Sequence, residues 1–161
     1  MHNCLVVCYS RSGHTARIGK EFADLCGADL EFIDDVSSRS GPLGYLRSVY
    51  ESLFHKEPRI NTSGKDPGDY AVVVLGTPVW AGNMAAPMRS YLARHRMRFH
   101  RIALFCTMGG RGGDRTLEEM ADLCGKAPMA RIAITDAEIR RGSYRSKLQS
   151  LQSRALELEM S

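Results

Sequence analysis

Three hydroxyl side chains and a glycine lie within six consecutive residues near the start of the sequence. They are Ser10, Ser12, Gly13 and Thr15. An apolar run precedes them and residues with helical periodicity follow them, so they fall at a strand-to-helix turn. The unpaired backbone N–H groups at a helix start, together with nearby hydroxyls, can bind a phosphate, and a glycine lets the backbone approach it closely. The sequence therefore predicts a phosphate-binding turn, against the alternative of an ordinary turn with a serine cap.

The segment 10–15 resembles the FMN-phosphate signature of the flavodoxin family. That signature has a hydroxyl residue, any residue, a hydroxyl residue, glycine, any residue and threonine. The resemblance implies noncovalent binding of FMN. Arg11 and His14 could add positive charge, although phosphate sites in this family use mainly neutral donors. The residues expected at the phosphate are Ser10, Arg11, Ser12, Gly13, His14 and Thr15.

A second loop, 76–83, follows the most β-branched apolar run and contains the only tryptophan, Trp80. The resemblance implies that this indole forms a flat wall for the flavin ring, and that Gly82 lets backbone groups reach the ring edge. We expect Pro78 to set the bend of the loop. The alternative for Trp80 is a core or interface residue. The residues expected to enclose the ring here are Pro78, Val79, Trp80, Ala81, Gly82 and Asn83.

A third loop, 106–113, has four glycines within five residues. Such a stretch is entropically costly unless bare backbone is required. The corresponding flavodoxin loop often supplies an aromatic side chain over the flavin, and this loop has none. Met108 takes that place, or the ring face stays open for a substrate. The residues expected near the ring are Thr107, Met108, Gly109, Gly110 and Gly113.

Apolar runs and periodic segments alternate along the whole chain. The runs predict strands at 4–9, 30–33, 70–75, 101–106 and 129–135. Apolar residues at helical spacing predict helices at 15–26, 42–54, 84–92, 117–124 and 148–158, and segment 58–69 is predicted to be a long loop. This alternation predicts an α/β, three-layer, doubly wound domain spanning 1–161 with a five-stranded parallel sheet. The flavodoxin-like order 2-1-3-4-5 would bring the three loops to one edge of that sheet.

Composition excludes several classes of protein. No apolar run could span a membrane and no signal sequence is apparent, so we expect a cytoplasmic protein without membrane contact. The five cysteines lack metal-ligand spacing, which predicts reduced, buried thiols and no metal site. The net charge of +4 is too small to indicate nucleic acid, and it departs from the strongly acidic flavodoxins that shuttle electrons.

Rival motifs do not match. Neither the Rossmann glycine pattern nor a P-loop is present. A tyrosine-phosphatase loop would need an arginine six residues after Cys8, where the sequence has His14. The segment 89–101 is rich in arginine and histidine, which indicates a solvated helix end, with binding of NADP, an acidic partner or nucleic acid as alternatives.

The favoured hypothesis is an FMN-dependent NAD(P)H oxidoreductase that reduces a quinone or a similar small acceptor. Because the flavin carries the redox chemistry, no catalytic side chain is predicted. Two alternatives stay open: a non-enzymatic FMN electron carrier that docks to redox partner proteins, and a flavin-free binding module. A homo-oligomer is compatible with all three.

Overall fold

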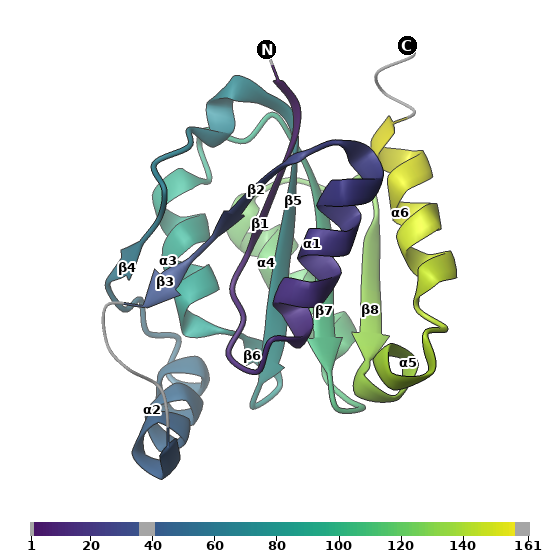
Figure 1. Ribbon diagram of the computed structural model, residues 1–161. Coiled ribbons are helices and arrows are strands. Elements are labelled where there is room, and N and C mark those ends of the chain that lie inside the picture. Colours follow the sequence, from purple (N-terminus) through teal and green to yellow (C-terminus); the bar gives the residue numbers. More distant parts are fainter. Residues whose placement is uncertain (1, 36–40, 157–161) are drawn as a thin grey trace.

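A parallel sheet of five long strands forms the centre of the molecule. The computed structural model describes residues 2–35 and 41–156 (Figure 1). The strands are hydrogen-bonded in the order β2-β1-β5-β7-β8, which is the predicted order 2-1-3-4-5 when these five are counted along the chain. The predicted fold class is therefore confirmed. The strands are β1 (His2–Cys8), β2 (Asp29–Phe32), β5 (Tyr70–Trp80), β7 (Arg101–Met108) and β8 (Arg131–Thr135).

Helices cover both faces of this sheet (Figure 1). On one face lie α1 (His14–Cys26), α5 (Asp136–Arg141) and α6 (Arg145–Leu156), whose buried side chains pack with one side of the strands. On the other face lie α3 (Ala86–His95) and α4 (Gly113–Cys124). The last predicted helix corresponds to α6, and its Leu158 lies outside the described residues.

The helix α1 packs tightly because its apolar stripe faces the sheet. Ile18 and Phe22 on this stripe are completely buried. At Gly19 an added Cβ would lie 2.8 Å from the Sγ atom of Cys8 on β1, so the helix backbone approaches the strand more closely than a larger residue would allow. Gly13 precedes the helix with φ +96°.

The helix α2 (Gly41–Leu53) confirms the second predicted helix but stands apart from the layered body (Figure 1). Its buried positions are small or polar, and its large apolar side chains are exposed. An apolar stripe on a helix normally indicates the face that packs on the core, and here that face points away from the sheet.

Two parts of the chain differ from the predicted elements. The segment 58–69 contains strand β4 (Ile60–Asn61), which pairs with β3 (Asp34–Asp35), and the 3₁₀ turn Pro67–Asp69, so it is not a plain loop. The short helix α5 was not predicted, because six residues are too few for a periodic pattern. The predicted turn residues Ser37, Ser38 and Ser40 lie outside the described residues.

The arginine-rich segment 89–101 is only partly a solvated helix end. Arg94 lies in the last turn of α3, where a cation opposes the helix dipole. His95 lies in the same turn, but burial lowers the pKa of its imidazole and so favours the uncharged form. Arg89 contradicts the prediction: it is buried, and its Nη2 lies 2.9 Å from a carboxylate oxygen of Glu119 on α4. Its charge therefore serves a contact between two helices.

The thiols of Cys8, Cys106 and Cys124 are buried, as predicted, whereas those of Cys4 and Cys26 are only partly buried, so the prediction is wrong for these two. Burial raises the pKa of the Cys8 thiol to about 12, so this residue is protonated at neutral pH and is a poor nucleophile. Within residues 2–35 and 41–156, none of the helices has the length and apolar character that a bilayer crossing requires.

Candidate functional site

A cleft of about 750 Å³ opens at the edge of the sheet where the parallel strands end. This volume falls within the usual range for small-molecule and cofactor sites. All five long strands contribute residues at or just beyond their carboxyl ends, which is where ligands bind in open α/β sheets. The lining consists of Tyr9, Ser10, Arg11, Ser12, His14, Ile33, Asp34, Asp35, Pro78, Val79, Trp80, Thr107, Met108, Gly109 and Asp136.

The predicted phosphate turn has the geometry of an open cradle. Ser10 Oγ accepts a hydrogen bond of 3.0 Å from the backbone N–H of Gly13, which folds the turn onto the start of α1. An added Cβ at Gly13 would meet nothing within 4 Å, so the space beside this turn is open. The first backbone N–H groups of α1 have no carbonyl acceptor within the helix, and they are therefore available to an anion.

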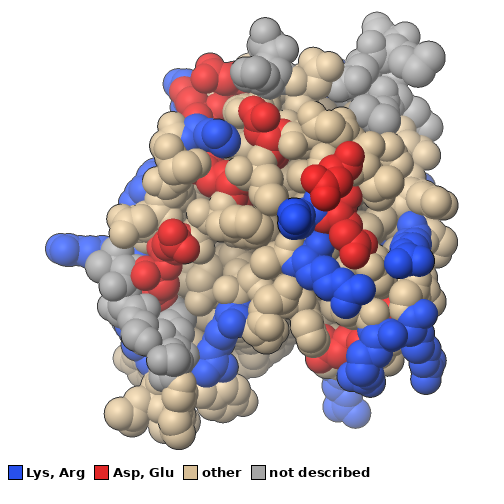
Figure 2. Space-filling model, viewed as in Figure 1, with Lys and Arg blue, Asp and Glu red and all other residues tan. Residues whose placement is uncertain are grey.

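Basic side chains gather at this end of the molecule, and the lining of the cleft itself is mixed in charge. In Figure 2, Lys and Arg side chains gather toward the lower end of the face shown, the end at which the central strands terminate in Figure 1. Within the described part of the chain, Arg11 is the one Lys or Arg side chain in the lining of the cleft, and its charge favours anionic ligands there. Three acidic residues also line the cleft, namely Asp34, Asp35 and Asp136.

One of these acidic residues, Asp136, pairs with His14. The Nδ1 atom of His14 lies 3.0 Å from a carboxylate oxygen of Asp136, the first residue of α5. Asp136 is held in place because Thr135 and Glu138 form a reciprocal cap at the start of that helix. The carboxylate therefore orients the imidazole at the mouth of the phosphate turn.

Thr15 supports the site from below without lining it. Its Oγ1 lies 2.8 Å from Oγ1 of Thr107, and both hydroxyls are buried. This bond joins the first turn of α1 to the end of β7. The phosphate turn and the glycine-rich loop are thereby fixed to each other.

The second predicted loop is a β-hairpin. Strand β5 continues through Pro78 to Trp80, and Val79 and Trp80 pair with the antiparallel strand β6 (Asn83–Met84). The expected bend at Pro78 is therefore wrong, because the chain turns at Ala81 and Gly82, with φ +50° and +79°. Positive φ at both central positions matches the twist of a tight hairpin. The pairing of β5 with β1 ends at Gly76, which lies opposite Cys8. Pro78 comes after this point, so its missing N–H group interrupts no hydrogen bond to β1.

Trp80 stands at the wall of the cleft on this hairpin. Its ring packs edge-on against Tyr9, with centroids 5.4 Å apart and an angle of 86° between the planes. Tyr9 ends the run that begins with β1, so the contact ties the hairpin to the segment before the phosphate turn. The indole is half-buried and its position is set by packing.

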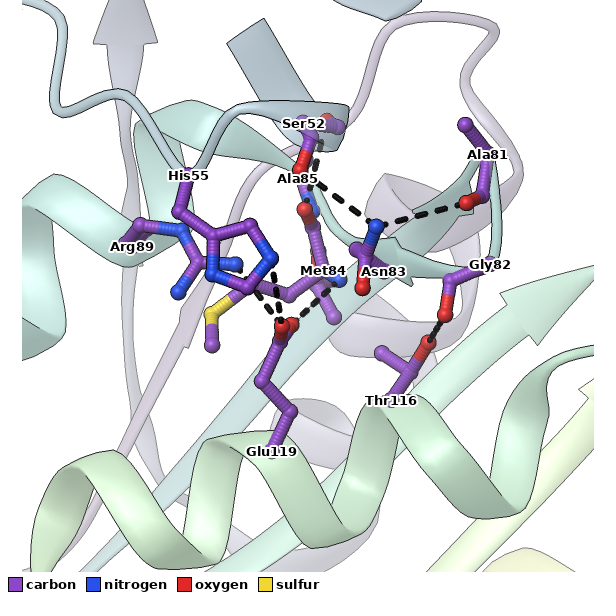
Figure 3. Close-up of polar contacts among 11 residues, drawn as sticks. Ser52, His55, Ala81, Gly82, Asn83, Met84, Ala85, Arg89, Thr116 and Glu119 are labelled. Atoms are coloured by element: carbon purple, nitrogen blue, oxygen red, sulfur yellow. Dashed lines mark hydrogen bonds and ion pairs between the residues drawn. The ribbon is translucent and has the colours of Figure 1, made fainter.

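Polar contacts fix the hairpin from beneath (Figure 3). The Nδ2 atom of Asn83 donates to the backbone carbonyls of Ser52 and Ala81, both at 3.3 Å. The carbonyl of Gly82 accepts from Thr116 on α4 at 3.4 Å. Glu119 accepts from the backbone N–H of Met84 at 3.0 Å while pairing with Arg89. Asn83 and Gly82 thus support the hairpin, and neither lines the cleft.

The four glycines of the third loop differ in whether a side chain at their position would clash with neighbouring residues. An added Cβ at Gly113 would lie 2.8 Å from Met108 Sδ, and one at Gly112, where φ is +88°, would lie 3.0 Å from Val79 Cγ1. These two glycines allow close packing of α4 against the strands and the hairpin. Gly109 and Gly110 have open space instead, and Gly109 lines the cleft.

The structure brings ten of the predicted residues together in the lining. They are Ser10, Arg11, Ser12, His14, Pro78, Val79, Trp80, Thr107, Met108 and Gly109. Seven predicted residues lie nearby without lining the cleft, and their part in ligand binding stays a prediction. They are Gly13, Thr15, Ala81, Gly82, Asn83, Gly110 and Gly113.

Sequence analysis missed five lining residues. They are Tyr9, Ile33, Asp34, Asp35 and Asp136. Each lies at or directly after the carboxyl end of β1, β2 or β8. Applying the rule that ligands bind at the carboxyl ends of parallel strands to every predicted strand would have found them.

Comparison with known proteins agrees with this architecture. No curated protein sequence matches the chain. A flavoprotein from Lactobacillus acidophilus NCFM, solved in complex with FMN, superimposes with a TM-score of 0.73 at 19% identity, covering 89% of this chain and 99% of its own. A flavoprotein from Bacteroides eggerthii DSM 20697 gives a TM-score of 0.75 at 19% identity, with coverage of 94% and 98%.

An enzyme has a more distant likeness to this chain. The apo form of an NADH:FMN oxidoreductase superimposes with a TM-score of 0.58 at 11% identity, covering 96% of this chain and 89% of its own. At such identities these likenesses concern the fold. The sequence itself matches the model of a flavodoxin family over residues 3–145, which is most of its length. This chain therefore belongs to the flavodoxin family.

Proposed function

We propose that this protein binds FMN in the cleft at the carboxyl edge of the sheet. The observation that carries the proposal is that one cleft contains both an open helix-start cradle, at Ser10–His14, and an aromatic wall, at Trp80. A phosphorylated, flat ligand needs both features at once. The FMN complex of the Lactobacillus acidophilus flavoprotein supports the choice of ligand.

The residues of the chain divide the work of binding. The hydroxyls of Ser10 and Ser12 and the first N–H groups of α1 would hold the phosphate, with His14 oriented beside it by Asp136. Trp80 and Val79 would cover one side of the ring system. When bound, FMN supplies the ability to accept and release electrons.

We further propose that the protein is an NAD(P)H-dependent oxidoreductase that reduces a quinone or a similar small acceptor. The glycine-rich loop presents Met108 and Gly109 to the cleft and has no aromatic side chain to cover the ring. An uncovered ring face leaves room for a nicotinamide or a quinone to stack. The likeness to an NADH:FMN oxidoreductase supports this view.

An electron carrier is the second candidate, because a carrier needs only an exposed ring edge. The mildly basic charge of the chain argues against it, since the charge departs from that of acidic shuttle proteins. The cytoplasmic location stays a prediction.

FMN titration of a Ser12→Asp variant tests the binding site. A carboxylate in the cradle would repel the phosphate, and we expect the Kd for FMN to rise by at least about 100-fold, which corresponds to about 2.7 kcal/mol. The matched control is Ser153→Asp, at an exposed position on α6, which should bind FMN like the unchanged protein. Equal affinity of Ser12→Asp and the control would refute the phosphate assignment.

Steady-state oxidation of NADH or NADPH by the FMN-loaded protein with a small quinone tests the reaction. We expect turnover without an added reductase. FMN binding with no turnover, but with rapid electron exchange with a separate flavin reductase, would favour the carrier. Failure to bind FMN at all would favour a flavin-free module.

A further inference from the structure

The strongest feature outside the cleft is the outer face of α2. Among the described residues, nine large apolar side chains are exposed, and six of them lie between positions 43 and 54. Each of the six is more than half exposed to solvent. These residues, the α2 face, are Leu43, Tyr45, Leu46, Tyr50, Leu53 and Phe54.

The helix α2 is amphipathic, but its apolar side faces solvent and its polar side faces the protein. Its inward positions are Gly44, Ser48, Glu51 and Ser52, and all four are buried against the body. The side toward the protein is thus small and polar, and contacts such as Ser52 Oγ to the carbonyl of Met84, at 3.3 Å, hold it there (Figure 3). An exposed patch of this kind marks an interaction site, because a monomer rarely leaves so much apolar surface in water.

The spacing of the outer residues identifies the kind of partner. Positions 43, 46, 50 and 53 are separated by three, four and three residues. This is the spacing of the apolar residues along which two packed helices meet, and we call these four positions the seam. The pattern is also symmetric about position 48: Leu46 and Tyr50 lie two residues on either side, and Leu43 and Leu53 lie five. An antiparallel second copy of the same helix would set Leu46 against Tyr50 and Leu43 against Leu53, as a two-fold interface requires.

Charge and exposure agree with such a pairing. None of the four seam positions is charged, so like charges would not meet across the two-fold axis. The flanking Arg47 is already paired with Glu51 of its own helix, at 2.7 Å. A stable interface buries at least about 1,200 Å² in total, and the surface that α2 offers to it consists of six large side chains, each more than half exposed. The α2 face, made of six described residues, has no charged residue that could recognise a charged partner.

We propose that the protein forms a homodimer through an antiparallel pairing of two α2 helices. The contact between Arg11 and the Tyr45 ring, 5.4 Å from guanidinium carbon to ring centroid, joins α2 to the phosphate turn, so the dimer interface borders the cleft. The pairing itself does not depend on FMN.

Sedimentation of the purified protein, with and without FMN, tests the dimer. We expect a mass of twice the 17.9 kDa chain. Leu46→Glu would bury a charge at the centre of the seam, and we expect the dimer Kd to rise at least about 100-fold. The control Met97→Glu, at a side chain 88% exposed and outside α2, should remain dimeric. A monomeric wild type at about 100 μM, or unchanged association of Leu46→Glu, would overturn the proposal.

Cysteine cross-linking tests the orientation. Leu46→Cys and Tyr50→Cys proteins are mixed and oxidised, and we expect the 46–50 cross-link between chains to form faster than the 46–46 cross-link. Both positions are exposed, so the variants should fold, which the circular dichroism spectrum would check. A faster 46–46 cross-link would contradict the antiparallel arrangement.

Discussion

The helices α1 and α2 have the same length and similar apolar spacing, but they relate to the protein in opposite ways. Each has 13 residues. The apolar residues of α1 are buried against the sheet, whereas those of α2 point to solvent and its small polar residues face the body. Periodicity therefore predicts that a helix forms and has an apolar side, but it does not say whether that side meets its own chain or another.

The largest expected effect breaks the inward packing of α1. Phe22→Ala removes a fully buried ring, and we expect the free energy of unfolding to fall by about 3–5 kcal/mol. The matching change on α2 is Tyr50→Ala in the Leu46→Glu background, where the helix is unpaired. There we expect a loss below about 1 kcal/mol. Urea denaturation measures both, and equal losses would show that the two helices bury comparable surfaces.

The next effect concerns the polar contacts of Glu119, which join α4 to α3 and to the hairpin next to α2. Glu119→Ala would leave the buried guanidinium of Arg89 without its partner and the N–H of Met84 without an acceptor. We expect a loss of about 3 kcal/mol in unfolding free energy and weaker FMN binding, because the hairpin that carries Trp80 would loosen. Glu118→Ala, at the exposed neighbouring position, is the control and should change neither measurement.

A smaller effect is expected from the hydroxyl that attaches α2 to the hairpin. Ser52→Ala removes the donor to the Met84 carbonyl, and the expected loss is about 1 kcal/mol. Hydrogen exchange should show faster opening of amides in α2 than in α1. Ser150→Ala, exposed on α6, should leave both rates unchanged. Unchanged exchange in Ser52→Ala would mean that other contacts hold α2.

The smallest effect tests the link between α2 and the phosphate turn. Tyr45→Ala removes the ring under Arg11, and in the Leu46→Glu background we expect about 0.5 kcal/mol less unfolding free energy. Tyr45→Phe keeps a ring face and should retain most of that stability. If both variants lose the same amount, the ring contributes through something other than the cation.

The candidate site was predictable where its signal was local. Ser10, Ser12 and His14 lie within one segment of five residues that matches a known motif. Trp80 was notable because it is the only tryptophan in the sequence and follows an apolar run. Asn83 and Gly113 were predicted as site residues on equally local evidence, but neither lines the cleft. The side chain of Asn83 donates a hydrogen bond to the carbonyl of Ser52, and Gly113 packs close to Met108. Which side of a backbone faces a cleft depends on the register of neighbouring elements, which short motifs do not contain.

The sequence by itself determined the alternation of strands and helices, the class of fold and the strand-to-helix turn at residues 10–15, because each depends on residues close together along the chain. Only the tertiary structure decided that Asp136 meets His14 across 122 positions, that β5 turns at Ala81, and that α2 presents its apolar side to solvent. These outcomes depend on which distant surfaces fill the space around each element. Local periodicity carries no information about that competition.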